Sequence, residues 1–281
     1  MSISAKSSSS RCVIRRLLAD ALRREGRRLE VARRNCRKRP TPVRVHAVRV
    51  ATRRLLAPAA LLEVVDGANG KALRKSLRRL LKVTGKARDA QVQVLHVASL
   101  TPRHPELRPF RRSLREKARR AALRVGPKLS QIEAGELLDR QVQALAKRSK
   151  DGDLERLLRR AVRTVIARVP GSRDAGSPSA KSFHRGRLAV KQARYLAEML
   201  HPLFLPDKGL WVRDLQRRQH LTGEIHDLQN LMARLERYAG RKRPGRPALQ
   251  PVLRQLARQT QRALRTYHAH RDVPPPPLRR W

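Results

Sequence analysis

Two stretches of this sequence repeat one another, His46-Ala-Val-Arg49-Val-Ala-Thr-Arg53-Arg54-Leu55 and His184-Arg-Gly-Arg187-Leu-Ala-Val-Lys191-Gln-Ala193. A second pair follows downstream, Val83-Thr84-Gly85-Lys-Ala-Arg88-Asp89 and Leu221-Thr222-Gly223-Glu-Ile-His226-Asp227. The two copies are offset by 138 residues throughout, and 39 residues separate the histidine from the glycine in both. Because the match needs no gap, the repeat predicts two related helical hairpins.

The basic residues of each copy recur at helical spacing. His46, Arg49 and Arg53 stand at positions i, i+3 and i+7, which project from one face of a helix. The row of the second copy contains His184, Arg187, Lys191 and Arg194. The opposite faces are apolar and predict core contacts for Val48, Ala51, Leu55, Ala59 and Leu62, and for Phe183, Val190, Ala193, Ala197 and Leu200.

The helix expected after each row is also basic. Its residues at helical spacing are Lys71, Lys75, Arg78 and Lys82 in the first copy and Arg213, Arg217 and His220 in the second. If each helix pair packs antiparallel, two cationic rows line a basic central groove or channel. The repeat then predicts two such grooves, or one groove that both copies share.

The remainder of the chain also follows the helical period, and alternation typical of strands is nearly absent, so we expect an all-α protein. Proline and glycine positions divide it into helices, with a turn at Gly67-Ala-Asn-Gly70. The expected helices span about residues 11–38, 43–66, 71–98, 105–124, 127–149, 152–169, 182–201, 209–239 and 248–271. The expected units are a disordered tail at 1–10, a first half at 11–169, a linker at 170–181, a second half at 182–271 and a Pro-rich basic tail at 272–281.

Composition points to an anionic partner. The net charge is +45, and 53 of the 67 basic residues are arginine, which forms bidentate contacts to phosphate. A GC-rich genome also enriches arginine and accounts for part of this excess. No apolar run reaches the roughly 18–20 residues of a membrane span, and the N-terminus lacks the apolar core of a secretory signal. Cys12 and Cys36 have no metal or disulfide spacing, so we expect a reducing compartment and no cofactor.

A basic helix face is usually a solvated face. Such faces normally intersperse acidic residues four positions before lysine, whereas the duplicated rows contain almost none, which favours an external anion. Asp89 and Asp227 end the rows, and each is either an orienter of a nearby cation, part of an acid–base pair or a metal ligand. Of these we favour the orienter. Gly85 and Gly223 cost about 1 kcal/mol each within a helix, so we expect close helix packing or a kink there.

Motifs for catalysis are missing from the sequence. It has no glycine-rich phosphate loop, paired-cysteine zinc site or nucleophile elbow. His226-Asp227 resembles part of a metal-dependent phosphohydrolase site, but its counterpart is Arg88-Asp89, and arginine does not ligate metals. We therefore expect a binding protein with no catalytic residues and no metal.

The choice of polyanion depends on aromatic residues. The chain has eight, and single-strand binders use aromatic stacking worth roughly 1–3 kcal/mol per base. Duplex DNA needs only phosphate contacts, so a sequence-nonspecific nucleic-acid-binding protein is the alternative. A groove with cations on several walls fits a thin anion without bases, such as inorganic polyphosphate.

The tandem His-x-x-Arg-x-x-x-Arg/Lys pattern, followed by Gly-x-x-Arg/His-Asp, resembles the CHAD domain (conserved histidine α-helical domain) over about residues 10–271. The resemblance implies two bundles of about four helices each, a basic central channel, polyphosphate binding, and a cytoplasmic location on polyphosphate granules. It assigns anion contacts to His46, Arg49, Arg53, Arg78, Lys82, Arg88, His184, Arg187, Lys191, Arg194, Arg213 and Arg217. His226 stands where the family more often has Asn, so no role is assigned to it. The oligomeric state is left open.

Overall fold

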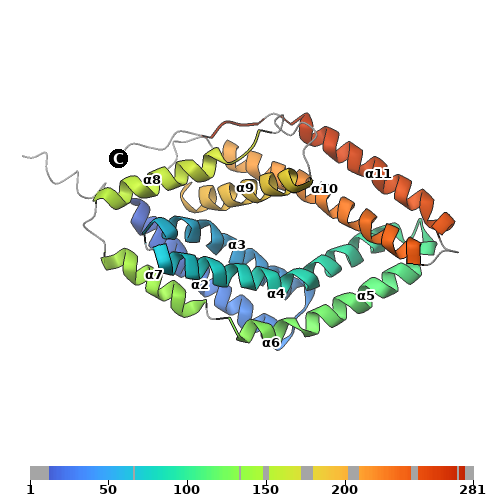
Figure 1. The fold of residues 1–281 in the computed structure, drawn as a ribbon, viewed down its shortest axis with the longest axis horizontal. Helices are drawn as coiled ribbons and strands as arrows, with labels where there is room; N and C mark the ends of the chain where they lie inside the picture. Colours follow the sequence, from blue (N-terminus) through green and yellow to red (C-terminus); the bar gives the residue numbers. More distant parts are fainter. Residues whose placement is uncertain are drawn as a thin grey trace, which may run out of the picture.

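The computed structural model describes residues 13–65, 67–132, 134–147, 152–171, 180–201, 209–241, 246–270 and 272–275. All regular elements within these ranges are helices, so the prediction of an all-α protein is confirmed (Figure 1). The tails predicted at 1–10 and, in part, at 272–281, and most of the predicted linker, lie outside the described residues. None of the described helices is long and apolar enough to cross a bilayer.

The helices match most of the predicted spans. They are α2 (Val13–Lys38), α3 (Pro42–Val65), α4 (Gly67–Leu100), the 3-10 helix η1 (Pro105–Leu107), α5 (Arg108–Leu123), α6 (Val125–Ser130), α7 (Gly135–Lys147), α8 (Gly152–Ala167), α9 (Ala180–Met199), α10 (Leu210–Arg241) and α11 (Arg246–His268). Local signals explain the first boundary. Arg37 and Lys38 lie in the last turn of α2, where positive charge is favourable, and Pro42 begins α3, where its missing N–H is not needed.

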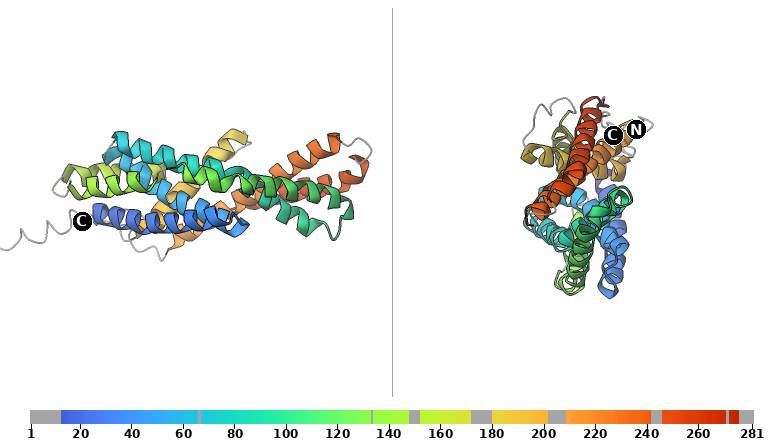
Figure 2. Two further views of the ribbon diagram at one scale, coloured as in Figure 1. Left: turned by 90° about the horizontal axis from the view of Figure 1, so that it is seen from below. Right: turned by 90° about the vertical axis from the view of Figure 1, so that its right-hand side faces the viewer.

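Two long helices join the two ends of the molecule. The 34 residues of α4 and the 32 residues of α10 each contribute to both large hydrophobic clusters. One cluster contains α2, α3, α6, α7, α8 and α9 with the first parts of α4 and α10. The other contains η1, α5 and α11 with the later parts of α4 and α10. Figures 1 and 2 show the resulting elongated shape, with α5 and α11 at one end.

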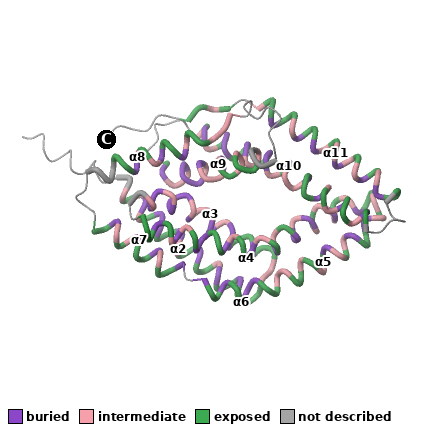
Figure 3. The backbone as a smooth tube through the Cα atoms, in the orientation of Figure 1, coloured by how far each residue is buried: buried purple, intermediate pink, exposed green. Residues whose placement is uncertain are grey.

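The predicted apolar faces lie in the core. Val48, Leu55 and Leu62 of α3 are at most 1% exposed, and Val190 of α9 and Leu200, directly after α9, are fully buried. Figure 3 shows the buried residues along the sides of the helices that face their neighbours. The faces of α3 and α9 that carry the histidine rows are thereby turned away from this core.

The helices are distributed unevenly about the predicted linker at residues 170–181. In the described residues, seven α-helices precede residue 170 and three follow it. Both large clusters combine helices from before and after the predicted linker. The reason is that α4 and α10 are long enough to pack in both bundles, so the hydrophobic core does not divide where the chain does.

The turn predicted at Gly67–Gly70 is wrong, because these residues form the first turn of α4. A Cβ atom at Gly70 would lie 2.7 Å from backbone atoms of Leu62 and Glu63. Gly70 is therefore needed for the close approach of the end of α3 to the beginning of α4 and not for a turn conformation.

The single helix predicted at 127–149 is also wrong, because the chain forms α6 and α7 with a break between them. Arg33 of α2 reaches this break and donates from Nη2 to the carbonyl oxygens of Leu129, at 2.9 Å, and Ile132, at 2.6 Å. Carbonyl groups at a helix end need such partners. A contact from a residue nearly 100 positions away thus stabilises an interruption that local sequence does not reveal.

Candidate functional site

The two duplicated rows meet in one place. Helix α3 packs against α4 and α9, and α9 packs against α10, so the four helices that carry the repeat are neighbours. Charges of one copy act on residues of the other. We call this group the central cluster, with residues His46, Arg49, Arg53, Arg88 and Asp89 from α3 and α4 and His184, Arg187, Lys191, His226 and Asp227 from α9 and α10.

Arg49 is the most firmly held cation of the cluster. It is 9% exposed, and its Nη1 donates to the carbonyl oxygen of Leu81 at 2.8 Å and to Oγ1 of Thr84 at 3.2 Å. Its Nε is buried without a hydrogen-bond partner. Burial, followed by repulsion from Arg53, lowers the pKa of Arg49 to about 10. The guanidinium is therefore oriented by α4 while part of its hydrogen-bonding capacity is unused.

Arg187 and Lys191 hold the corresponding positions on α9. Burial, followed by repulsion from Arg53 of the other copy, lowers the pKa of Arg187. Burial, then Arg53 and Arg187, lowers the pKa of Lys191 to about 7. The Nε of Arg187, like that of Arg49, is buried without a hydrogen-bond partner. The cations of the two copies thus repel one another across the α3–α9 interface.

The histidines of the cluster are held in the neutral form. Burial and then Arg88, Arg53 and Arg49 lower the pKa of His46, and burial with Arg187 and Lys191 lowers that of His184. Burial and Arg187 lower the pKa of His226 to about 4. The rings of His184 and His226 have centroids 6.2 Å apart, and His226 Nε2 lies 2.9 Å from Nδ2 of Asn230. Sequence reasoning assigned no role to His226, although its position opposite Arg88 in the repeat marked it.

The carboxylate of each copy affects the pKa of an arginine of the other copy. Burial lowers the pKa of Arg88, and Asp227 opposes this lowering more than the adjacent Asp89 does. Asp89, in turn, opposes the lowering of the pKa of Arg187 that burial causes. Neither carboxylate forms an ion pair with the described residues, so the orienter role stays a prediction. Five basic side chains face two carboxylates, which leaves an excess of three positive charges when Lys191 is protonated.

The remaining predicted cations lie outside this cluster. The Nε atom of Arg194 is 3.6 Å from Glu198 Oε1, and its guanidinium carbon lies 4.4 Å from the centroid of the Tyr195 ring. Arg213 and Arg217 are exposed on α10, 14 and 10 residues before Asp227, which is about 21 Å and 15 Å along a helix. These three residues therefore stay predictions as anion contacts, since none of them is among the charges that shift the pKa values of the cluster residues.

A second basic surface runs along α4. We call it the outer row, and it consists of Lys71, Lys75, Arg78 and Lys82. All four side chains are exposed and line a surface cavity of about 540 Å³. Two predicted site residues, Arg78 and Lys82, belong to this surface, and Arg78 also lines a larger cavity together with Arg53 and Lys191 of the central cluster.

Close helix packing, one of the two reasons expected for the repeated glycines, is not seen in the described part of the structure, and a kink there stays a prediction. A Cβ atom at Gly223 would meet nothing within 4 Å, so close packing against the described residues does not explain this glycine. A Cβ at Gly85 would lie 3.8 Å from Nη1 of Arg49, an ordinary contact distance. Both glycines therefore leave the helix surface beside the central cluster uncovered.

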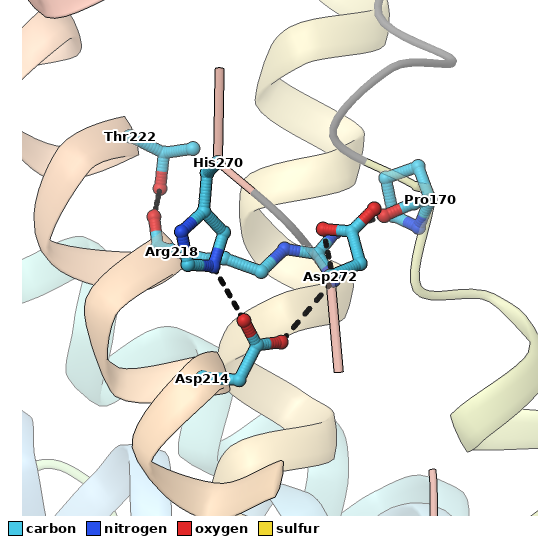
Figure 4. Close-up of polar contacts among 6 residues, drawn as sticks. All are labelled: Pro170, Asp214, Arg218, Thr222, His270 and Asp272. Atoms are coloured by element: carbon cyan, nitrogen blue, oxygen red, sulfur yellow. Dashed lines mark hydrogen bonds and ion pairs between the residues drawn. The ribbon is translucent and has the colours of Figure 1, made fainter. Parts of the chain in front are cut away.

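One group of side chains in the described residues has the spacing of metal ligands. Ligand atoms of Asp214, His270 and Asp272 lie within 4.8 Å of one another. Figure 4 shows Arg218 in the same group, with Nη1 3.8 Å from Asp214 and 3.4 Å from Asp272, while its Nη2 donates to the carbonyl of Pro170. His270 Nε2 is 2.5 Å from Asp214 Oδ1. Arg218 already supplies the positive charge that balances the two carboxylates. The network connects Pro170 and the segment after α11 to α10.

Comparisons with known proteins agree with the all-helical fold. The family model of the CHAD domain matches residues 20–236. The crystal structure of the CHAD domain from the plant Ricinus communis is similar to this chain, with a TM-score of 0.71, 22% sequence identity and coverage of 94% of each chain. A search among curated proteins found no match. Since the family model covers more than half of the chain, the chain belongs to the CHAD domain family.

Proposed function

We propose that this protein binds inorganic polyphosphate at the central cluster and does so without catalysing a reaction. The observation that carries the proposal is the repulsion between cations of the two copies. After burial, the charge of Arg53 is the largest cause that lowers the pKa of Arg49 in its own copy and of Arg187 and Lys191 in the other copy. A bound polyanion would remove this repulsion and supply hydrogen-bond acceptors to the unused Nε atoms of Arg49 and Arg187.

A chain of phosphates suits this cluster better than a nucleic acid. Single-stranded nucleic acids gain affinity by stacking on exposed aromatic rings. Phe183 and Tyr195 directly adjoin the second row in sequence. The ring of Phe183 packs against Tyr267, with centroids 5.9 Å apart, and Tyr195 is only 6% exposed with its ring in contact with Arg194. Phosphate contacts that ignore bases are the remaining source of affinity, and a polyphosphate chain presents phosphates alone.

The cellular role follows from binding without catalysis. We propose that the protein is a scaffold or targeting protein on cytoplasmic polyphosphate granules. The net charge of +45 supports a stable association with such a dense anion. Fluorescent fusion proteins would test this location, and a diffuse signal in cells that contain granules would contradict it.

Competition between polyanions tests the proposed ligand. The full chain is bound to labelled long-chain polyphosphate at near-physiological salt and displaced with unlabelled polyphosphate or with DNA at equal phosphate concentration. We expect polyphosphate to displace the label at a concentration at least about tenfold lower than DNA. Equal displacement would favour sequence-nonspecific nucleic-acid binding, whose affinity derives from phosphate contacts and is strongly salt-dependent.

A further inference from the structure

A second cavity adjoins the central cluster, between α3, α4, α8 and α9. It has a volume of about 790 Å³, within the range of cavities that hold small organic ligands. Arg53 and Lys191 of the central cluster form part of its lining. The cavity is thus continuous with the cationic site but extends away from it toward α8.

Much of the lining of this cavity is aliphatic. The buried residues Ala57, Leu61 and Val165 contribute to it. Leu157 of α8 and Leu188 of α9 also line it, although they are 41% and 50% exposed. Two exposed leucines from separate helices that border one cavity form an apolar surface that water covers in the free protein. Burying such surface stabilises a complex by about 25 cal/mol per Å².

Cations surround this aliphatic surface. The cavity is lined by Arg53, Lys71, Arg78, Arg160, Arg168 and Lys191. The one acidic side chain of the lining, Glu63, lies 2.5 Å from Nη1 of Arg74. The cavity therefore offers positive charge and aliphatic surface within the same space.

Polyphosphate does not use the aliphatic part of this cavity, because it consists of charged groups throughout. A nucleotide base would gain from exposed aromatic rings, whereas the aromatic side chain of the lining is the buried Tyr195. An aliphatic chain with an anionic head group complements both parts of the lining. The lining thus favours an amphiphilic anion, which differs from the ligand proposed for the central cluster.

We propose that this cavity binds a single-chain alkyl phosphate. The alkyl chain lies along α8 and α9 against Leu157 and Leu188, and the phosphate head lies toward Arg53 and Lys191. The proposal shares these two cations with the central cluster but does not require polyphosphate to be the ligand there.

Calorimetry with dodecyl phosphate below its critical micelle concentration tests the proposal. Inorganic phosphate supplies the head without the chain, and dodecyl maltoside supplies the chain without the anionic head. We expect dodecyl phosphate to bind about tenfold or more tightly than either of them. Equal binding of dodecyl maltoside would overturn the proposal, since the cations would then contribute nothing.

Variants of the exposed leucines locate the binding. Leu157→Gln with Leu188→Gln should weaken dodecyl phosphate binding about tenfold and leave the affinity for long-chain polyphosphate unchanged. The matched control is Leu95→Gln with Leu123→Gln, since these leucines are 60% and 63% exposed and do not line the cavity. An equal loss in the control would overturn the proposal, because binding would then be unspecific adsorption of a detergent. A change in oligomeric state of the first variant, without a change in alkyl phosphate affinity, would instead assign the surface to a second copy of the chain.

The two proposals fail separately in these experiments. If the wild-type protein binds polyphosphate but does not bind dodecyl phosphate, only the proposal for the cavity is contradicted. Binding of dodecyl phosphate by a protein that does not prefer polyphosphate over DNA contradicts the central cluster's proposed ligand alone.

Discussion

The central cluster and the outer row are both rows of basic residues on helices, yet their surroundings differ. Lys71, Lys75, Arg78 and Lys82 of the outer row are exposed, so water and salt compensate their charge. Arg49 in the central cluster is 9% exposed. Arg53 of the first copy lowers the pKa of Arg187 and Lys191 of the second copy. The difference teaches that burial and convergence of charge, and not its mere presence on a helix, distinguish the proposed binding site.

The largest expected effect comes from removing the same charge in the two regions. We expect Arg49→Gln with Arg187→Gln to weaken polyphosphate binding by about a hundredfold, since hydrogen bonds to charged groups contribute roughly 1.5–3 kcal/mol each. Lys75→Gln with Lys82→Gln removes two positive charges from the outer row, and we expect a loss of about threefold. Titration of both variants against long-chain polyphosphate measures the two effects, with circular dichroism to verify the fold. Similar losses would mean that total charge and not the cluster binds the anion.

The pH dependence of affinity should be the next largest effect. Burial, then Arg53 and Arg187, lowers the pKa of Lys191 to about 7, so about a tenth of these side chains carry a proton at pH 8. A bound polyanion favours the protonated form, and affinity should therefore rise by about tenfold as the pH falls from 8 to 6. Binding isotherms at several pH values measure this rise. Lys191→Arg should retain the affinity at pH 6 and lose most of the increase, and an unchanged profile in this variant would exclude Lys191 as its source.

The smallest expected effect concerns stability without ligand. Because the pKa of Lys191 is about 7 in the folded protein, below its ordinary value of 10.5, the unfolded chain binds more protons between these pH values. The free energy of unfolding should therefore increase as the pH rises from 7 toward 10. At pH 7 we expect Lys191→Met to raise the melting temperature by about 2–4 °C, which corresponds to ~1 kcal/mol. Lys86→Met on the exposed side of α4 is the control, and an equal increase there would contradict the cause given.

Much of the fold was predictable because the helical period and the breakers are local signals. The row through His46, Arg49 and Arg53 and the apolar face through Val48 and Leu55 were both evident from spacing alone. The convergence of both rows in one cluster was not predictable, because the repeat allowed two grooves or one. Only the packing of α3 against α9 decides that charges of both copies act on one another.

The errors of the sequence analysis also have physical causes. Gly70 was interpreted as a turn residue, but its role is the close approach of α3 to α4, which depends on tertiary packing. The break before α7 depends on Arg33, almost 100 residues away. Arg78 and Lys82 are exposed because the other side of α4 faces the core. A row of charges at helical spacing does not predict which side of a helix faces the core.

The central claim is that two copies of a motif build one anion site. Titration calorimetry of the full chain with inorganic tripolyphosphate tests it most directly, with wild-type protein and with Arg49→Gln and Arg187→Gln as single variants. We expect one tight binding event per chain, which either substitution weakens. Two equal events per chain, each lost only when its own copy is altered, would contradict the account.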